Sequence, residues 1–260
     1  IMNRIKNNHL WYEDICKYYN ITKEEAYELS NRKRGRKPSL PGSKTCQPVS
    51  NMTFEELWDM KPRETSAQIF EFYKDIGSWS SIRQPRYNKD QDWSLVLKYM
   101  FDYNPEKKVH NILEYGSGVG PISRFTNDNY SNKFHFTLVD VPCECLHFAR
   151  FRLNERGLKE SEDFNIVELE PEKFPEFDRK FDLVTVCDVF EHCDAPYEAL
   201  QNILKYCHSN TIFLENWVEH SNDEVSTGCD LDRDKQKTQK SIKDNFEYLT
   251  GYGNRIWKKK

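Results

Sequence analysis

The second half of the chain alternates short apolar runs with amphipathic stretches. Five apolar runs have the length and the β-branched or aromatic content of buried strands. They lie at 109–113, 134–139, 164–168, 181–187 and 211–215. Helical spacing follows some of these runs, as at 145–156 and 197–206. Strands that alternate with helices predict an α/β fold built on a mostly parallel sheet with helices on both faces.

Two last apolar runs, at 246–250 and 255–257, lie on either side of a turn that contains Gly251 and Gly253. They predict a final pair of strands joined as a hairpin. The charged stretch before them, 233–243, is predicted to be a solvated loop or helix.

Helical patterns fill the chain before Val109. The predicted helices span 10–19, 22–31, 53–58, 64–76 and 91–103. Thr22 and Glu25 have capping-box spacing, which supports the start of the second helix. Gly77 is predicted to stop the fourth. The first two helices fit either a helix-turn-helix or a simple packing hairpin.

A basic stretch separates the first two helices from the rest. Residues 31–43 combine arginine and lysine with glycine and proline, which is typical of a linker or an extended arm. Within it, Arg34-Gly-Arg-Lys-Pro38 resembles an AT-hook, although Lys37 interrupts the core of that motif. We therefore predict three parts: N-terminal helices with a basic linker (1–50), a helical cap (51–107) and a core (108–260).

Composition narrows the class of protein. The 42 acidic and 38 basic residues leave a formal net charge of −4. A net negative charge argues against electrostatic attraction of the whole protein to nucleic acid. No apolar run is long enough to span a bilayer, and residues 1–10 have no signal-peptide pattern, so we expect a cytoplasmic protein without a membrane partner. None of the eight cysteines forms a C-x-x-C pair, which excludes the common zinc and thioredoxin motifs.

The most informative stretch follows the first predicted strand. Glu114 closes the strand, Gly116, Gly118 and Gly120 follow, and Pro121 suits the first position of a helix. Glycines let the backbone approach a ligand without intervening Cβ atoms. A strand, a glycine turn and a helix N-terminus together predict a nucleotide-type binding corner.

An acidic residue lies at the position where folds of this type bind a ribose. Asp140 lies 140 − 120 = 20 positions beyond Gly120, at the end of the second predicted strand. A carboxylate at a strand's carboxyl end can accept hydrogen bonds from both ribose hydroxyls. Asp140 is therefore the predicted ribose ligand.

Two motifs carry a resemblance to a known family. An acidic residue followed by Gly-x-Gly-x-Gly, as at 114–120, resembles motif I of the class I S-adenosylmethionine-dependent methyltransferases. Asp188-Val-Phe-Glu-His192 is similar to the motif after the fourth strand in small-molecule methyltransferases of the ubiquinone-biosynthesis type. That motif often has an Asp-Pro pair nearby, whereas here Ala195 separates Asp194 from Pro196. The resemblance covers Leu97 to Glu215. It implies a Rossmann-like sheet beneath a helical N-terminal cap, with S-adenosylmethionine as cofactor.

The resemblance also implies a set of cofactor-binding residues. These are Glu114, Gly116, Ser117, Gly118, Gly120, Asp140, Glu168 and Asp188. Glu170 is an alternative to Glu168, because both lie at the end of the third strand, near the expected adenine.

Transfer of a methyl group to oxygen requires that the acceptor lose a proton, which calls for a base or a metal ion. His192 is the predicted base, with Glu191 beside it, and no metal is predicted. The alternative is that Asp188, Glu191 and His192 hold a divalent ion, with His220 as a further ligand; their spacing resembles the Glu-x-x-Glu-His set of small-RNA 2′-O-methyltransferases.

Acceptor-binding residues are predicted just before the glycine corner. Trp79, Arg83 and Tyr87 are of the types that line pockets, although they could equally pack the cap onto the core. Two signatures of DNA-base methyltransferases are missing. The Pro-Cys pair at 142–143 follows the second predicted strand, where cytosine-C5 methyltransferases do not keep it. The Asp/Asn-Pro-Pro-Tyr/Phe signature of amino-methylating DNA enzymes does not follow the fourth strand, so methylation of a DNA base is disfavoured.

We therefore predict a methyltransferase whose acceptor is a small molecule or a saccharide, modified on oxygen or nitrogen. The alternative is a protein associated with DNA or RNA that docks weakly through its basic arm, 32–37.

Overall fold

The computed structural model describes residues 11–31, 54–88, 91–217, 231, 233–251 and 253–260. The predicted basic arm and His220 lie outside these residues. In the described part of the chain, no helix combines the length and the apolar character that crossing a membrane requires.

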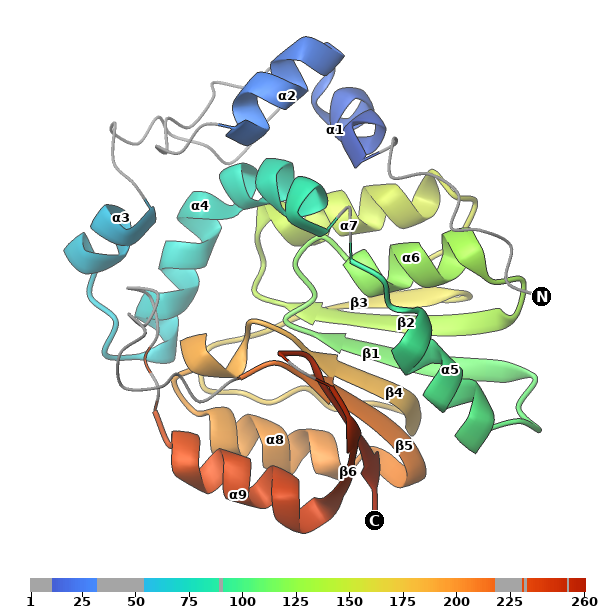
Figure 1. Cartoon of the computed structure of the whole chain (residues 1–260). Helices are drawn as coiled ribbons and strands as arrows, with labels where there is room; N and C mark the ends of the chain where they lie inside the picture. The colour runs from blue at the N-terminus through green and yellow to red at the C-terminus, as the bar shows by residue number, and fades with distance from the viewer. Residues whose placement is uncertain (1–10, 32–53, 89–90, 218–230, 232, 252) are drawn as a thin grey trace.

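A seven-stranded sheet forms the centre of the molecule, in the order β3-β2-β1-β4-β5-β7-β6 (Figure 1). The strands are β1 (Val109–Tyr115), β2 (Lys133–Asp140), β3 (Phe164–Glu168), β4 (Phe181–Val186), β5 (Cys207–Glu215), β6 (Phe246–Thr250) and β7 (Arg255–Lys259). The first five pair in parallel, and β7 pairs antiparallel with both β5 and β6. The predicted parallel sheet and terminal hairpin are confirmed.

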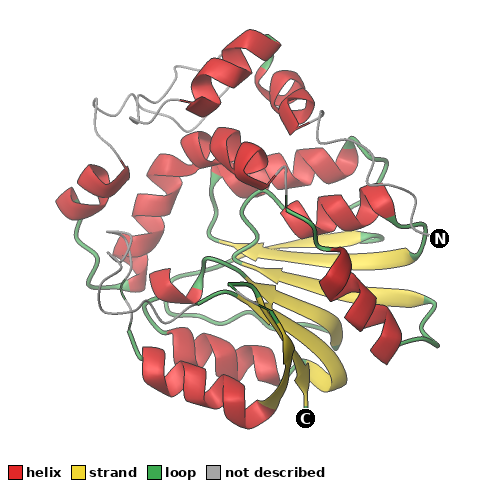
Figure 2. Ribbon diagram, viewed as in Figure 1, coloured by secondary structure: helices red, strands yellow, loops and turns green. Residues whose placement is uncertain are grey.

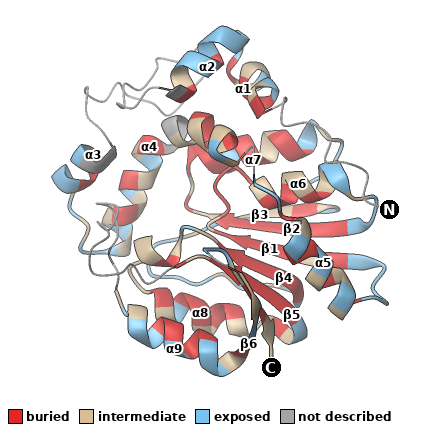
Figure 3. Ribbon diagram, viewed as in Figure 1, coloured by how far each residue is buried: buried red, intermediate tan, exposed pale blue. Residues whose placement is uncertain are grey.

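Helices cover both faces of this sheet (Figure 2). Side chains of α5 (Ser94–Tyr103), α6 (Pro121–Asn129) and α7 (Glu144–Asn154) share one hydrophobic cluster with the sheet, and those of α8 (Pro196–Leu204) and α9 (Lys235–Asn245) share another. Neighbouring residues of a strand point to opposite faces. Ile112 accordingly packs in the first cluster and Leu113 in the second. Figure 3 shows the strands as the most buried part of the fold.

The predicted N-terminal helices form a hairpin packed on the domain. They are α1 (Trp11–Tyr19) and α2 (Lys23–Asn31), and both contact α4 (Ser66–Tyr87). The capping box of α2 is present, because Thr22 N donates to Glu25 and Glu25 N donates to Thr22. The short α3 (Phe54–Met60) precedes α4. The division of the chain into three parts stays a prediction, although α5 packs in the same cluster as the sheet.

One predicted helix end is wrong. Gly77 does not stop the fourth helix, because α4 continues for three further turns to Tyr87. A glycine within a helix costs only about 1 kcal/mol relative to alanine. Apolar side chains on both sides of Gly77, including Ile69, Ile76 and Ile82, are buried. Tertiary packing therefore offsets the local preference of glycine, and the segment 78–87 is helical rather than a loop.

Candidate active site

A cavity of about 320 Å³ lies between α4 and the carboxyl ends of the parallel strands, within the range of small-molecule sites. The ends of β1 and β2 and the loops that follow β1, β2, β3 and β4 form one wall. The other wall is a stripe along α4, made of Ser66, Ile69, Phe70, Tyr73, Ile76, Ser80 and Gln84. Ligands of open α/β sheets bind at this edge.

The glycine corner has the conformation that the sequence predicts. Gly116, Gly118 and Gly120 all have positive φ, at 69°, 50° and 62°. A Cβ on Gly116 would lie 2.2 Å from Val189 Cγ2, so the close approach of the β4–α8 loop requires glycine there. The N–H groups of Gly116 and Ser117 donate to the Val139 carbonyl at 2.7 and 3.0 Å, which ties the loop to β2.

Asp140 lies at the end of β2, in the cavity wall. Its carboxylate accepts hydrogen bonds from Gly118 N at 2.5 Å and from its neighbour Val141 N at 2.7 Å. A carboxylate has about four acceptor positions, so capacity remains for ribose hydroxyls. Burial raises the pKa of Asp140 to about 6, despite the stabilising backbone N–H groups of Gly118 and Val141.

Glu114 holds the glycine corner from behind. Its buried carboxylate accepts hydrogen bonds from the N–H and hydroxyl of Ser123 and from Ile122 N, in the first turn of α6. Burial raises the pKa of Glu114 to about 7, although these donors favour the charged form. The side chain therefore points to the helix N-terminus rather than into the cavity, and direct contact with a cofactor stays a prediction.

Asp188 is held in an unusual backbone conformation at the start of the β4–α8 loop. Its φ is 54°, in the left-handed region that aspartate tolerates better than most residues. Asn216, just after β5, receives a hydrogen bond from Asp188 N and donates one to Asp188 Oδ1, both at 2.7 Å. Asn216 therefore orients an acid that lines the cavity. Sequence reasoning missed Asn216, because no motif contains it.

Removing this pair of hydrogen bonds provides a test of Asp188. In Asn216→Ala, we expect binding of S-adenosylhomocysteine, the demethylated cofactor, to weaken about five- to tenfold, equivalent to about one net hydrogen bond. Calorimetric titration measures this change. Asn245→Ala is a matched control, because it removes an asparagine hydrogen-bonded to Ser241 away from the cavity. Parental affinity in Asn216→Ala would remove Asp188 from the predicted cofactor ligands.

His192 and Glu191 occupy the short 3-10 helix η2 (Phe190–His192) after β4. His192 lines the cavity, and its ring lies 6.3 Å from that of Tyr73 on α4, measured between centroids. Glu191 lies outside the cavity lining, and its carbonyl accepts a hydrogen bond from Leu231 N at 2.7 Å. The structure thus brings His192, but not Glu191, into the cavity wall.

Two of the predicted acceptor-binding residues lie outside the cavity wall. The guanidinium of Arg83 donates to the hydroxyl of Tyr87, one turn along α4, and Tyr87 is largely exposed. Trp79 lies in α4, and its side chain is outside the described part of the chain. The cavity-lining stripe on α4 has spacings of three and four residues, a signal that extends past Gly77. At the end of β3, Glu170 lines the cavity and Glu168 does not.

Two of the thiols in the cavity wall, those of Cys145 and Cys193, are poor nucleophiles. Cys143, Cys145 and Cys193 line the cavity. A hydrogen bond with Cys143 and burial raise the pKa of Cys145 well above its ordinary value, and burial raises that of Cys193 to about 12. A protonated thiol is a poor nucleophile and packs as a small apolar group.

Among the described residues no cluster of three or more potential metal ligands occurs. The metal alternative also involves His220, which lies outside the described residues, and it stays untested.

Residues 113–213 match the protein family described as methyltransferase domain. Over these residues the chain carries a methyltransferase domain, and its mostly parallel sheet is consistent with the class I S-adenosylmethionine-dependent type. The glycine corner at 116–120 and the acid at the end of β2, Asp140, both lie within the matched residues.

Several solved structures are similar to this chain. The cyclase SpnF has a TM-score of 0.50 at 19% identity, over 73% of this chain and 76% of that chain. An S-adenosylmethionine-dependent methyltransferase from Aquifex aeolicus has a TM-score of 0.45 at 15% identity, over 65% and 98%. An O-methyltransferase from Bacillus cereus, in complex with S-adenosylhomocysteine, has a TM-score of 0.44 at 15% identity, over 65% and 81%. No curated protein matches the sequence.

S-adenosylmethionine is the predicted cofactor of the methyltransferase domain, and the residues present fit it. Gly118 has a φ of 50°, which favours glycine, and a Cβ there would lie 2.3 Å from Gln84 Oε1. The buried hydroxyl of Ser117 has no hydrogen-bond partner in the described part of the chain. A glycine-rich loop lets a ligand lie directly on the backbone, and the unpaired hydroxyl of Ser117 could hydrogen-bond to a polar ligand there.

Proposed function

We propose that this enzyme transfers a methyl group from S-adenosylmethionine to a hydroxyl oxygen of a small-molecule acceptor. The observation that carries the proposal is the position of His192 in the cavity wall, across from the apolar and aromatic side chains of α4. These side chains favour an acceptor with an apolar or aromatic body. A cavity of about 320 Å³ also favours a small molecule over a polymer.

Each proposed residue has one task. Asp140 would bind the ribose hydroxyls, Glu170 would contact the adenine, and Asp188 with the glycine corner would hold the remainder of the cofactor. The cofactor would supply an electrophilic methyl group on a sulfonium. His192 would take the proton that the acceptor hydroxyl loses when it receives the methyl group. Because the sulfur becomes neutral, much of the rate enhancement comes from alignment of the two substrates.

The alternative of nucleic-acid docking rests on the basic arm, 32–37, which lies outside the described residues. The cavity gives it no support. The apolar side chains of the α4 wall, Ile69, Phe70 and Ile76, favour an apolar acceptor over a saccharide, although Ser66, Tyr73, Ser80 and Gln84 of the same wall carry hydrogen-bonding groups.

Binding and turnover test the proposal separately. Calorimetric titration with S-adenosylhomocysteine should give saturable heat, and the absence of heat from folded protein would contradict cofactor binding. A panel of phenols, aliphatic alcohols, amines and sugars, assayed by release of S-adenosylhomocysteine, then tests the acceptor class. Turnover of phenols or alcohols supports the proposal. Turnover confined to amines would overturn the oxygen-acceptor assignment, and turnover confined to sugars would overturn the preference for an apolar acceptor. Both outcomes would leave the cofactor assignment intact.

A further inference from the structure

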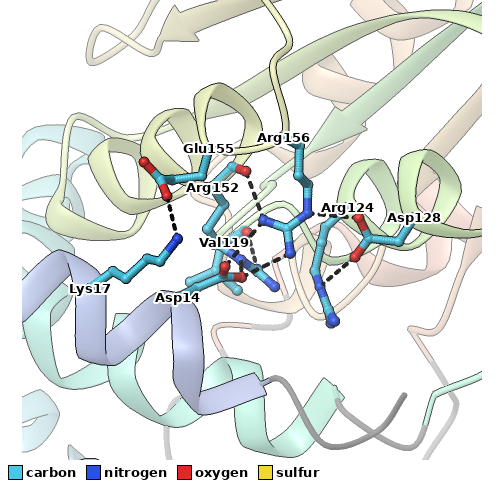
Figure 4. A network of polar contacts seen from close by, with 8 residues as sticks. All are labelled: Asp14, Lys17, Val119, Arg124, Asp128, Arg152, Glu155 and Arg156. Carbon is cyan, nitrogen blue, oxygen red and sulfur yellow. Dashed lines mark hydrogen bonds and ion pairs between the residues drawn. The ribbon is translucent and has the colours of Figure 1, made fainter. Parts of the chain in front are cut away.

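A buried arginine holds the cofactor loop. Arg152, on α7, is only 2% exposed, and its Nη1 donates to the carbonyl of Val119 at 2.6 Å (Figure 4). Val119 is the residue between Gly118 and Gly120, so this contact holds the centre of the glycine corner. On the opposite edge of the same residue, Val119 N donates to Gln84 Oε1 of α4 at 3.1 Å. The peptide groups of Val119 are thus held from two sides.

The charge of Arg152 is balanced by the N-terminal hairpin. Asp14, on α1, accepts from Arg152 Nε at 2.9 Å and from both Nη groups of Arg156 at 3.2 Å. Burial alone would raise the pKa of Asp14, but the two guanidinium charges outweigh it and hold that pKa below its ordinary value. Asp14 is therefore ionised at neutral pH. It lies outside the cavity lining.

Apolar packing follows the same route. Val119 belongs to one hydrophobic cluster with Trp11, Ile15 and Tyr19 of α1. Val141 and Cys143, which line the cavity beyond Asp140, belong to this cluster as well. The hairpin therefore lies directly behind the wall that holds the cofactor, and not on a remote surface.

We propose that the N-terminal hairpin, residues 11–31, is a positioning element for the cofactor, and that Asp14 acts on the glycine corner through Arg152 and Val119. Without the Asp14 carboxylate, Arg152 is a buried cation without its strongest partner. Its guanidinium then turns toward other acceptors and releases the Val119 carbonyl. Binding sites require their ligating groups to be held within about 0.5 Å, so a loosened corner binds the cofactor less tightly.

The proposal rests on cofactor binding and not on the identity of the acceptor. Asp14→Asn should raise the Kd for S-adenosylhomocysteine about tenfold, the worth of one hydrogen bond from a charged group. Asp14→Glu, which keeps the charge, should restore most of the affinity. Lys17→Ala is the matched control, because Lys17 joins the same two helices through an exposed ion pair with Glu155 at 2.8 Å. Its Kd should equal the parental value.

A second variant separates positioning from stability. Arg152→Lys keeps a buried cation beside Asp14, but one ammonium cannot reproduce the guanidinium's contacts with both Asp14 and Val119. It should raise the Kd about as much as Asp14→Asn. Ligand should also slow hydrogen exchange of residues 11–31 in the parental protein and much less in Arg152→Lys. Affinity is measured at a temperature well below the melting temperature of each variant, so that the protein is folded. The proposal is overturned if either variant then has the parental affinity, or if ligand leaves hydrogen exchange in the hairpin of the parental protein unchanged.

Discussion

Replacing His192 by alanine should lower turnover about 10²–10⁴-fold, the usual worth of a positioned general base. The residue lines the cavity at the end of β4, where bound ligands of such sheets lie. An imidazole can accept a proton near neutral pH, and an acceptor hydroxyl must lose one during the reaction. Because His192 has no predicted cofactor contact, the Kd for S-adenosylhomocysteine should stay within about twofold of the parental value. Steady-state assay with an identified acceptor, together with calorimetry, measures both quantities.

Two comparisons make the His192 result specific. His147→Ala removes an exposed histidine of α7 outside the cavity wall and should leave turnover unchanged. Recovery of His192→Ala by added Mg²⁺ or Mn²⁺ would instead assign the residue to a metal site. Parental turnover in His192→Ala would show that the histidine is structural.

Asp140→Ala should weaken binding of S-adenosylhomocysteine by about 1.5–3 kcal/mol, or about 10- to 150-fold, the worth of hydrogen bonds to a charged group. Part of this loss comes from the ribose, and part from the glycine corner, because Gly118 N loses its acceptor. Asp140→Asn separates the two effects. Its amide oxygen can still accept from Gly118 N, but its charge is lost. Calorimetry on both variants apportions the effect, and parental affinity in both would exclude Asp140 as the ribose ligand.

The buried position of Asp140 also makes cofactor binding depend on pH. Burial raises its pKa to about 6. The ionised carboxylate is the form that accepts from hydroxyl groups, so affinity should be constant above about pH 7. It should fall below pH 6, approaching tenfold per pH unit as the protonated form dominates. Asp140→Asn should lose this dependence. A decline that persists in the variant would assign it to another group, such as Glu114, whose pKa is about 7.

The sequence predicted the sheet and the cofactor corner well. The bounds of β3 and β6 agree with the predicted ranges residue for residue, because buried strands and glycine turns are local patterns. The three glycines have the left-handed φ that the motif requires, and Asp140 lies beside them. These features depend on residues near one another in the chain, or on a spacing that the fold preserves.

Other features of the site depend on contacts between distant parts of the chain. Nothing local shows that α4 continues through Gly77, since the free energy that offsets this glycine comes from packing on the core and on α1. Because the helix continues, Gln84 rather than Arg83 or Tyr87 reaches the cofactor corner.

Asn216 and Arg152 show the same limit. Asn216 lies 28 residues from Asp188, and Asp14 lies 138 residues from Arg152. Neither pair has a sequence signal, because a hydrogen bond between distant elements depends on how those elements pack and not on spacing along the chain. The amino-acid sequence by itself determined the type of fold, the class of cofactor and the acid at the end of β2. Only the tertiary structure decided which side chains of α4, the β5 end and the N-terminal hairpin lie around that site.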